Sequence, residues 1–338
     1  DDTLYAYAPP VALNGYQYRC VVTGGCGGTA TSNAATLTLY GKPAITSQPV
    51  NTAVCVGSTA SFTVGTTGTS LTYQWRVNTG SGWTNVTNGS IYSGATTNTL
   101  AITGAPITSA GNYQCIISGT CAPPATTNTV TLWIYTAPGI TSQPIDKIVC
   151  TGSNTSISVN ASANGGTPIS YQWEVDNGSG YTTLANGAPY SGVNTNTLNI
   201  TAAPASLDGY RYRCVVSTPC TPSVTSTAAR LTVKGLPTIT QHPVPSIVCP
   251  GSIATFSVAA TGAGLTYQWQ VNSGSGWSNV PATSDYSGNN SPTLTVNVQK
   301  SMASNLLRCI VSGDCAPPAI SNSALLTALI TVDIKWHD

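Results

Sequence analysis

Leu71-Thr72-Tyr73-Gln74-Trp75 is the most informative segment of this chain for predicting its fold. Apolar and polar residues alternate along it and it ends in tryptophan, which predicts a half-buried strand that places one large ring in a core. The pattern returns as Ile169-Ser170-Tyr171-Gln172-Trp173 and as Leu265-Thr266-Tyr267-Gln268-Trp269. Three copies at nearly constant spacing predict that one small folded unit is used repeatedly.

The eleven cysteines repeat with the same period, in three sets named here by their order within a unit. The leading cysteines are Cys55, Cys150 and Cys249, the middle cysteines are Cys20, Cys115, Cys214 and Cys309, and the loop cysteines are Cys26, Cys121, Cys220 and Cys315. The middle cysteines follow one another at steps of 95, 99 and 95 residues. A period of this length predicts an array of domains and not a solenoid of short repeats.

Residues 44–138 hold one complete unit. Short alternating runs at 60–64, 71–77, 99–102, 110–115 and 130–133 predict strands, and turn residues separate them. About seven short strands with turns every 8–12 residues are typical of a β-sandwich, so we predict an all-β fold. The plan recurs, and we expect complete domains at 44–138, 139–237 and 238–338. The joints between them are short and contain proline, which favours a stiff connection.

Residues 1–43 match only the last part of a unit. Thr3 and Leu4 stand 17 and 16 residues before Cys20, as Thr197 and Leu198 stand before Cys214. A strand at Thr3-Leu4 would therefore be the fifth strand of a unit, whose first four strands are missing. Because three strands cannot close a sandwich core, we expect either a longer chain or another chain that supplies the missing strands.

The composition excludes several classes of partner. Only 6% of the 338 residues are charged and the net charge is +1, so no basic face predicts binding to nucleic acid or anionic lipid. No apolar run approaches the roughly 20 residues of a membrane helix, and no signal peptide is visible. Cysteines in repeated positions favour an oxidising compartment and disulfides. Metal binding is the rival interpretation, and only His242 and His337 could join the cysteines as histidine ligands.

Several motifs together resemble a known family of repeats. The chain repeats Ser-Gln-Pro, Val-Cys-x-Gly-Ser, Tyr-Gln-Trp and Tyr-Ser-Gly, and it carries Gly-Tyr-x-Tyr-x-Cys at Gly15–Cys20 and Gly209–Cys214. These elements resemble the tandem immunoglobulin-like repeats of giant Bacteroidota surface proteins, including gliding-type adhesins exported by the type IX system. The resemblance implies immunoglobulin-like sandwiches in a long secreted or cell-surface filament. It also implies partners such as further copies of the repeat, surface glycans or other cells.

The chain departs from the immunoglobulin pattern at its cysteines. Val64, Val159 and Val258 stand where the usual second core cysteine would lie, so the usual disulfide across the core cannot form. We therefore expect the middle cysteines to be buried thiols that behave as small apolar side chains. The last unit also has Leu307 where the others have the tyrosine of the Tyr-x-Cys motif.

The leading and loop cysteines are expected at opposite ends of one sandwich. The intervening strand alone spans about 23 Å, whereas a disulfide needs Cα atoms within about 7 Å. Where units follow head to tail, a leading cysteine would meet the loop cysteine of the next unit. This hypothesis pairs Cys55 with Cys220 and Cys150 with Cys315, which would resist bending and shear.

In that scheme the disulfide partners of Cys26 and Cys121 would lie in missing upstream parts, and the partner of Cys249 would lie in a fifth unit. Three alternatives stay open. One is a short Cys115–Cys121 link, one is a Cys55–Cys121 link inside a unit of altered topology, and one is a link between protomers.

No catalytic, metal or cofactor site is predicted. Glu174 and Asp176 lie two residues apart and could form a carboxylate pair, but Arg76 and Asn78, then Gln270 and Asn272, replace them in the sister units. A solvated strand face is the simpler interpretation, because acid–base catalysis needs a defined pair or a nucleophile with a base.

Three aromatic residues, Trp83, Tyr181 and Trp277, follow Gly-rich hairpins. They could contact glycans or a neighbouring chain, or they could pack over the sheet. The sequence therefore favours a non-catalytic, extracellular structural or adhesive segment. A passive stalk of a large secreted enzyme and a glycan-binding module are the alternatives.

Overall fold

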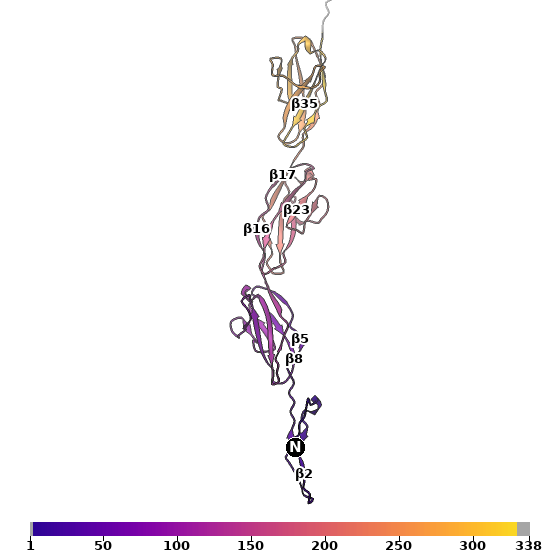
Figure 1. Cartoon of the computed structure of the whole chain (residues 1–338). Helices are drawn as coiled ribbons and strands as arrows, with labels where there is room; N and C mark the ends of the chain where they lie inside the picture. Colours follow the sequence, from indigo (N-terminus) through magenta and orange to yellow (C-terminus); the bar gives the residue numbers. More distant parts are fainter. Residues whose placement is uncertain (1–2, 330–338) are drawn as a thin grey trace, which may run out of the picture. The chain divides into compact units, whose positions relative to one another are not determined.

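The computed structural model describes residues 3–329, and these form short β-strands joined by turns and four 3-10 segments (Figure 1). His337 and the ends of the expected first and last domains lie outside the described residues. The chain divides into two units. Unit 1 runs to Pro138 and includes the loops Ala163–Ile169 and Thr218–Pro222, and unit 2 holds Gly139–Ser162, Ser170–Ser217 and the residues from Ser223 onward.

In unit 1 a complete sandwich begins at Ala44. Its six-stranded sheet has the order β10-β9-β13-β15-β6 with β14 beside β13, its three-stranded sheet has the order β11-β12-β7, and β5 pairs with β8. β6 is parallel to β15, whereas the other pairs are antiparallel. The elements are β5 (Ala44–Ser47), β6 (Thr52–Cys55), β7 (Ala60–Thr63), β8 (Gly65–Thr67), β9 (Thr72–Asn78), β10 (Thr84–Asn85), β11 (Tyr92–Ser93), β12 (Thr99–Ile102), η2 (Ile107–Ser109), β13 (Gly111–Ser118), β14 (Ala125–Thr126) and β15 (Val130–Tyr135).

The Tyr-Gln-Trp stretch lies on β9, at the centre of this sandwich. Trp75 is fully buried, and its indole Nε1 donates a hydrogen bond of 2.9 Å to the carbonyl oxygen of Thr97. The preceding Gln74 points the other way, and its Nε2 donates to the carbonyl oxygens of Trp75 and Val86. Because side chains alternate along the strand, Trp75 fills the core while Gln74 on the opposite face satisfies carbonyl oxygens near the sheet edge.

Residues 3–43 of unit 1 form a smaller structure. It contains η1 (Val11–Leu13) and four short strands, which are β1 (Gln17–Tyr18), β2 (Val21–Thr23), β3 (Thr29–Thr31) and β4 (Ala35–Thr36). β1 pairs with β4 and β2 pairs with β3. The strand expected at Thr3-Leu4 is absent from the structure. In the complete sandwich the corresponding strand β12 pairs with β7, and the described part of residues 3–43 offers no such partner.

Unit 2 repeats the architecture twice. The first repeat has sheets β17-β26-β24-β20-β21 with β25 beside β24, β18-β23-β22, and β16-β19. Its elements are β16 (Gly139–Ser142), β17 (Lys147–Cys150), β18 (Thr155–Ser158), β19 (Asn160–Ser162), β20 (Ser170–Asp176), β21 (Tyr181–Thr183), β22 (Tyr190–Ser191), β23 (Thr197–Ile200), η3 (Ala205–Leu207), β24 (Arg211–Ser217), β25 (Val224–Thr225) and β26 (Ala229–Lys234). β17 runs parallel to β26, as β6 does to β15.

The second repeat of unit 2 has sheets β28-β37-β35-β31-β32 with β36 beside β35, β29-β34-β33, and β27-β30. Its elements are β27 (Thr238–Gln241), β28 (Ser246–Val248), β29 (Ile253–Ser257), β30 (Ala259–Thr261), β31 (Thr266–Asn272), β32 (Ser278–Asn279), β33 (Tyr286–Ser287), β34 (Thr293–Asn297), η4 (Lys300–Met302), β35 (Asn305–Ser312), β36 (Ala319–Ile320) and β37 (Ala324–Ala328).

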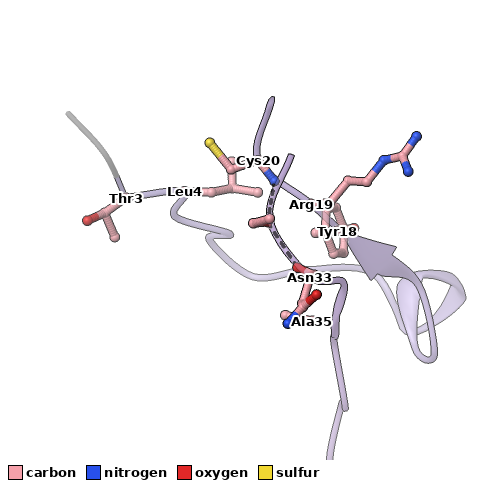
Figure 2. A pocket seen from close by; sticks show the side chains of 8 residues that line it. Thr3, Leu4, Tyr18, Arg19, Cys20, Asn33 and Ala35 are labelled. Atoms are coloured by element: carbon pink, nitrogen blue, oxygen red, sulfur yellow. Dashed lines mark hydrogen bonds between the residues drawn. The ribbon is translucent and has the colours of Figure 1, made fainter. Parts of the chain in front are cut away.

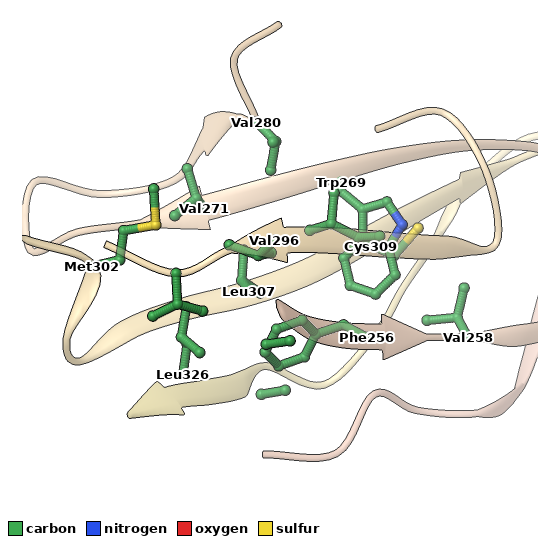
Figure 3. Close-up of a cluster of buried hydrophobic side chains, with 14 of the residues drawn as sticks. Phe256, Val258, Trp269, Val271, Val280, Val296, Met302, Leu307, Cys309 and Leu326 are labelled. Carbon is green, nitrogen blue, oxygen red and sulfur yellow. The ribbon is translucent and has the colours of Figure 1, made fainter. Parts of the chain in front are cut away.

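The core of this last repeat shows how the missing tyrosine is replaced. Trp269, Phe256 and Cys309 fill the centre between the two sheets (Figure 3). In the earlier repeats Tyr113 and Tyr212 bond through their hydroxyls to Tyr92 and Tyr190. Here Leu307 and Met302 occupy the same end of the core, and the hydroxyl of Tyr286 lies 3.8 Å from the Met302 sulfur. Leu307, paired with Val271 as Tyr113 is paired with Val77, takes the position of the tyrosine, and the soft Met302 thioether packs in the same core.

Candidate functional site

Two disulfides are the chemical feature that recurs in the structure. Cys55 is bonded to Cys220 with a Cα–Cα distance of 5.6 Å, and Cys150 is bonded to Cys315 with a Cα–Cα distance of 5.7 Å. Each bond spans 165 residues and joins a leading cysteine to the loop cysteine of the following repeat. These are the two pairs that the spacing argument brought together.

The leading cysteines are positioned by the parallel strand pair. Cys55 ends β6 opposite Tyr135 of β15, and Cys150 ends β17 opposite Lys234 of β26. A turn follows each cysteine at once, because Gly57 and its counterparts adopt a φ near +80° that favours glycine. The leading cysteine is therefore placed beside the last residue of the final strand of its repeat.

The loop cysteines reach the same point from the next repeat. Cys220 is 3% exposed and Cys315 is 1% exposed. The hydroxyl oxygen of Thr218 lies 3.0 Å from the carbonyl oxygens of both Thr136 and Cys220, within hydrogen-bond distance of each, which fastens the loop to the end of the preceding strand. In unit 2 the ammonium of Lys234 lies 2.5 Å from a carboxylate oxygen of Asp314, next to Cys315. Each disulfide is thus supported by a polar contact between the same two segments.

Three middle cysteines are buried thiols. Cys115, Cys214 and Cys309 are 0% exposed and lie opposite Trp75, Trp173 and Trp269 in the strand register. Burial raises the pKa of each thiol from 9.0 to about 11, because the apolar core disfavours the thiolate. These thiols are poor nucleophiles and act as core side chains.

Cys20 does not share this environment, and its expected burial is wrong. Cys20 and Tyr18 are exposed, although their counterparts Cys115 and Tyr113 are 0% exposed. The cause is that no second sheet covers residues 3–43 in the described part of the chain. Leu4, Tyr18, Cys20 and Ala35 instead line an open groove (Figure 2). The backbone N–H of Cys20 still donates to the hydroxyl of Ser32, as the N–H groups of the buried middle cysteines donate to a Thr or Ser hydroxyl.

Three further cysteines have no cysteine partner among residues 3–329. Cys26 and Cys249 are exposed, whereas Cys121 is half-buried. The sulfur of Cys121 lies 3.3 Å from the carbonyl oxygen of Tyr40, at the end of residues 3–43. Cys115 and Cys121 are not bonded to each other, and neither are Cys55 and Cys121.

The aromatic residues after the hairpins are half-buried against arginines. The Arg213 guanidinium lies 3.7 Å from the centre of the Tyr181 ring, and the Arg308 guanidinium lies 4.2 Å from that of Trp277. Beside Trp83 the arginine comes from the other strand, since Arg76 on β9 donates to the Trp83 carbonyl oxygen at 3.4 Å. An arginine of a cross-strand pair therefore stacks on the rings of Tyr181 and Trp277, whereas at Trp83 it contacts the backbone carbonyl oxygen. Sequence reasoning missed these contacts, although an arginine at either member of the pair was a visible signal.

The carboxylates at Glu174 and Asp176 are used separately. Glu174 accepts a 2.7 Å hydrogen bond from Arg213 Nε, and Asp176 accepts from the backbone N–H groups of Gly178 and Gly180. Neither carboxylate contributes to an acid–base pair. Within residues 3–329 no group of three or more His, Cys, Asp and Glu side chains could hold a metal ion. Over the same residues no helix is long and apolar enough to cross a membrane.

Known proteins support the fold and leave the activity open. Residues 42–118 match the immunoglobulin domain family. Endoglucanase C of Cellulomonas fimi is 36% identical over 152 residues, which are 44% of this chain and 13% of that protein. The match thus spans about an eighth of that relative.

Two solved structures are similar in fold. The I-band fragment I67–I69 of titin gives a TM-score of 0.53 at 17% identity, covering 86% of this chain and 99% of the fragment. Sidekick-1 immunoglobulin domains 1–5 give a TM-score of 0.50 at 20% identity, covering 94% of this chain and 67% of that structure. The sheets, the buried tryptophans and these similarities agree that the chain is an all-β protein of tandem immunoglobulin-like domains.

Proposed function

We propose that this chain is a non-catalytic structural segment of an extracellular cell-surface filament or adhesin, in which disulfides couple each repeat to the next. The observation that carries the proposal is the recurrence of the same link, Cys55–Cys220 and Cys150–Cys315, at the same separation of 165 residues. A disulfide needed only to stabilise one domain would lie inside that domain. A disulfide that recurs between successive domains instead stabilises the joint between them.

The strand pairing favours resistance to tension. β6 lies near the start of its repeat and β15 at its end, and the two strands are parallel. When the disulfides are open, pulling on the two ends of the repeat therefore shears all hydrogen bonds of this pair together. Cys55 at the end of β6 is bonded to Cys220 of the next repeat. The disulfide therefore secures the end of this strand pair and the joint to the next repeat. The same arrangement recurs in β17 and β26.

The chemistry of the chain fits an extracellular location. Disulfides persist in oxidising compartments, and with 6% charged residues the surface polarity comes from uncharged side chains. The motifs that resemble giant Bacteroidota surface proteins support export by the type IX system and a role in gliding or adhesion. Partners of such a segment would be further repeats of its own kind, with surface glycans or other cells at the adhesive end.

The second candidate is a stalk within a large secreted enzyme. It is favoured by the 36% identity with part of endoglucanase C. In that setting the disulfide-coupled repeats would hold a catalytic domain at a distance from the surface, so the mechanical role of this segment would be unchanged. The glycan-binding alternative has less support, because Trp83, Tyr181 and Trp277 are half-buried and an arginine contacts each residue.

Small-angle X-ray scattering of the chain, with and without reductant, tests the structural role. We expect the radius of gyration of the oxidised protein to stay constant across salt concentrations, and its distance distribution to broaden on reduction as the joints loosen. The Cys220→Ser and Cys315→Ser double variant should behave like reduced protein, whereas Cys121→Ser, which removes a loop cysteine outside any disulfide, should behave like the wild type. Identical scattering of all forms would contradict the proposal.

Binding to insoluble polysaccharides separates the alternatives. A structural segment is expected to stay in the supernatant with cellulose, chitin and xylan. Retention that is lost on replacing Trp83, Tyr181 and Trp277 by alanine would overturn the structural assignment in favour of glycan binding.

A further inference from the structure

We propose that Asn177 is a site of spontaneous deamidation, in which the side-chain amide is lost as ammonia and the Asp176 carboxylate acts as the base. The site does not depend on the disulfides and lies in the hairpin loop between β20 and β21. Asn177 precedes Gly178, and both residues are exposed. Because glycine has no Cβ, its backbone nitrogen is accessible to the side chain of the preceding asparagine.

The hairpin loop places a base on the proton that must be removed. An oxygen of the Asp176 carboxylate accepts hydrogen bonds from the backbone N–H groups of Gly178, at 2.8 Å, and Gly180, at 2.9 Å. The Gly178 nitrogen is the nucleophile that would attack the side chain of Asn177, and its proton already points at a carboxylate. General-base catalysis requires this contact, with the two heavy atoms within about 3.2 Å.

The same loop also activates the group under attack. The backbone N–H of Ser179 donates a 3.2 Å hydrogen bond to Oδ1 of Asn177. Negative charge develops on this oxygen when the Gly178 nitrogen attacks the adjoining Cγ, and a donor fixed there stabilises that charge. The electrophile, the nucleophile, the base and the donor to the oxyanion therefore belong to four consecutive residues, 176–179.

The two sister loops keep the hydrogen bonds of this loop and lack both reactive groups. Asn78 and Asn272 stand in the place of Asp176, and their side-chain oxygens accept from the equivalent glycine N–H groups. The next residue is Thr79 in one loop and Ser273 in the other, and neither has an amide to lose. The second complete repeat therefore differs from its sisters by having the base and the electrophile together.

The other Asn-Gly pairs of the chain are held differently. At Asn14, Asn88 and Asn186 the side-chain oxygen accepts from a backbone N–H seven or more residues away. The N–H of the following glycine donates to a backbone carbonyl oxygen in each of these pairs. At Asn164 the following glycine packs closely against the backbone of β15. These pairs, all within the described residues, have no carboxylate on the glycine N–H and serve as internal controls.

The reaction needs water and no other reagent. The Gly178 nitrogen forms a bond to Cγ of Asn177 while its proton passes to the Asp176 carboxylate. The tetrahedral intermediate then collapses, the proton moves to the side-chain nitrogen, and ammonia leaves a five-membered succinimide behind. Water opens this ring at either carbonyl carbon and gives aspartate or isoaspartate. The chain gains one negative charge, so its formal net charge changes from +1 to 0.

Peptide mapping of the purified chain during incubation at neutral pH tests the proposal. Mass spectrometry should find aspartate and isoaspartate at position 177 roughly fivefold or more faster than at Asn88 and Asn186 in the same digest. Asp176→Asn keeps the acceptor that the sister loops use, and it should slow the reaction at Asn177 by roughly the same factor. Glu174→Gln is the matched control, because it removes a carboxylate two residues away and should leave the rate unchanged.

The pH profile separates a base from a structural effect of Asp176. Where hydroxide must remove the amide proton, as expected at Asn88, the rate rises about tenfold per pH unit. Where a carboxylate removes it, the rate should change by less than roughly threefold between pH 6 and 8. Three results would each overturn the proposal: a reaction at Asn177 no faster than at Asn88, an unchanged rate in Asp176→Asn, and a hydroxide-like pH profile at Asn177.

Discussion

At the scale of single residues, the thiols of one chain fall into two chemical classes because of where the fold places them. The middle thiols of Cys115, Cys214 and Cys309 are sealed in the core, and burial raises their pKa to about 11. The exposed thiols of Cys20, Cys26 and Cys249 meet solvent. Reactivity follows the thiolate and its access, so position decides which cysteine is inert and which can be oxidised.

Alkylation of the native protein should separate these classes. At pH 8 iodoacetamide should label Cys20, Cys26 and Cys249 within minutes and leave the three buried thiols unlabelled until urea unfolds the chain. Mass spectrometry of the digest measures this. Rapid labelling of Cys214 in native protein would contradict the burial described here.

The same burial makes stability depend on pH. In the unfolded chain a thiol ionises near 9, whereas the native thiol keeps its proton to about 11. The free energy of unfolding therefore keeps its full contribution from each buried thiol below pH 9. It falls as the pH rises towards 11, by roughly 2–3 kcal/mol for each thiol. Cys115→Ala should lose less stability between pH 8.5 and 10.5 than the wild type does, as measured by urea unfolding. An equal loss in both proteins would contradict the prediction.

At the scale of elements, an arginine between two strands joins the hairpin aromatic to the sheet. Arg213 on β24 bonds Glu174 on β20 and stacks on Tyr181 of β21, so three strands meet at one side chain. The arrangement recurs with Arg308, Gln270 and Trp277. A charge held against a ring and paired in this way ties the short edge strand to the sheet.

Replacing Arg213 should loosen that edge. We expect Arg213→Gln to destabilise its repeat by about 1 kcal/mol, because a cation–π contact and a partly exposed ion pair are each worth less than that alone. Arg211→Gln, on the same strand but exposed, should cost little. Denaturant unfolding of both variants measures the difference. Equal stability of the two variants would mean that the stack contributes nothing.

Much of the element structure could be predicted from the sequence because it depends on local alternation. Trp75, Trp173 and Trp269 occupy the core as their strands require. Two features could not be predicted. Cys20 shares its motif with the buried cysteines, and only the absence of a covering sheet over the described residues 3–43 exposes it. The arginine stacks depend on how closely the arginine before a middle cysteine approaches the hairpin aromatic on another strand, and spacing along the chain does not show that approach.

At the scale of the whole molecule, the two disulfides interleave along the chain. Cys150 lies within the loop closed by Cys55–Cys220, and Cys220 lies within the loop closed by Cys150–Cys315. A covalent route can therefore run from Cys55 to Cys220, back along the chain to Cys150, and across to Cys315. Tension on the ends follows this short route and bypasses most of the chain.

Single-molecule stretching of the chain from its two ends tests whether the disulfides couple the repeats covalently. With both disulfides closed, only about 150 residues can extend, which gives a contour length of about 50 nm at roughly 3.5 Å per residue. After reduction all 338 residues can extend, to about 120 nm. We predict this difference between oxidised and reduced protein. A contour length near 120 nm in both conditions would contradict the covalent coupling of the repeats.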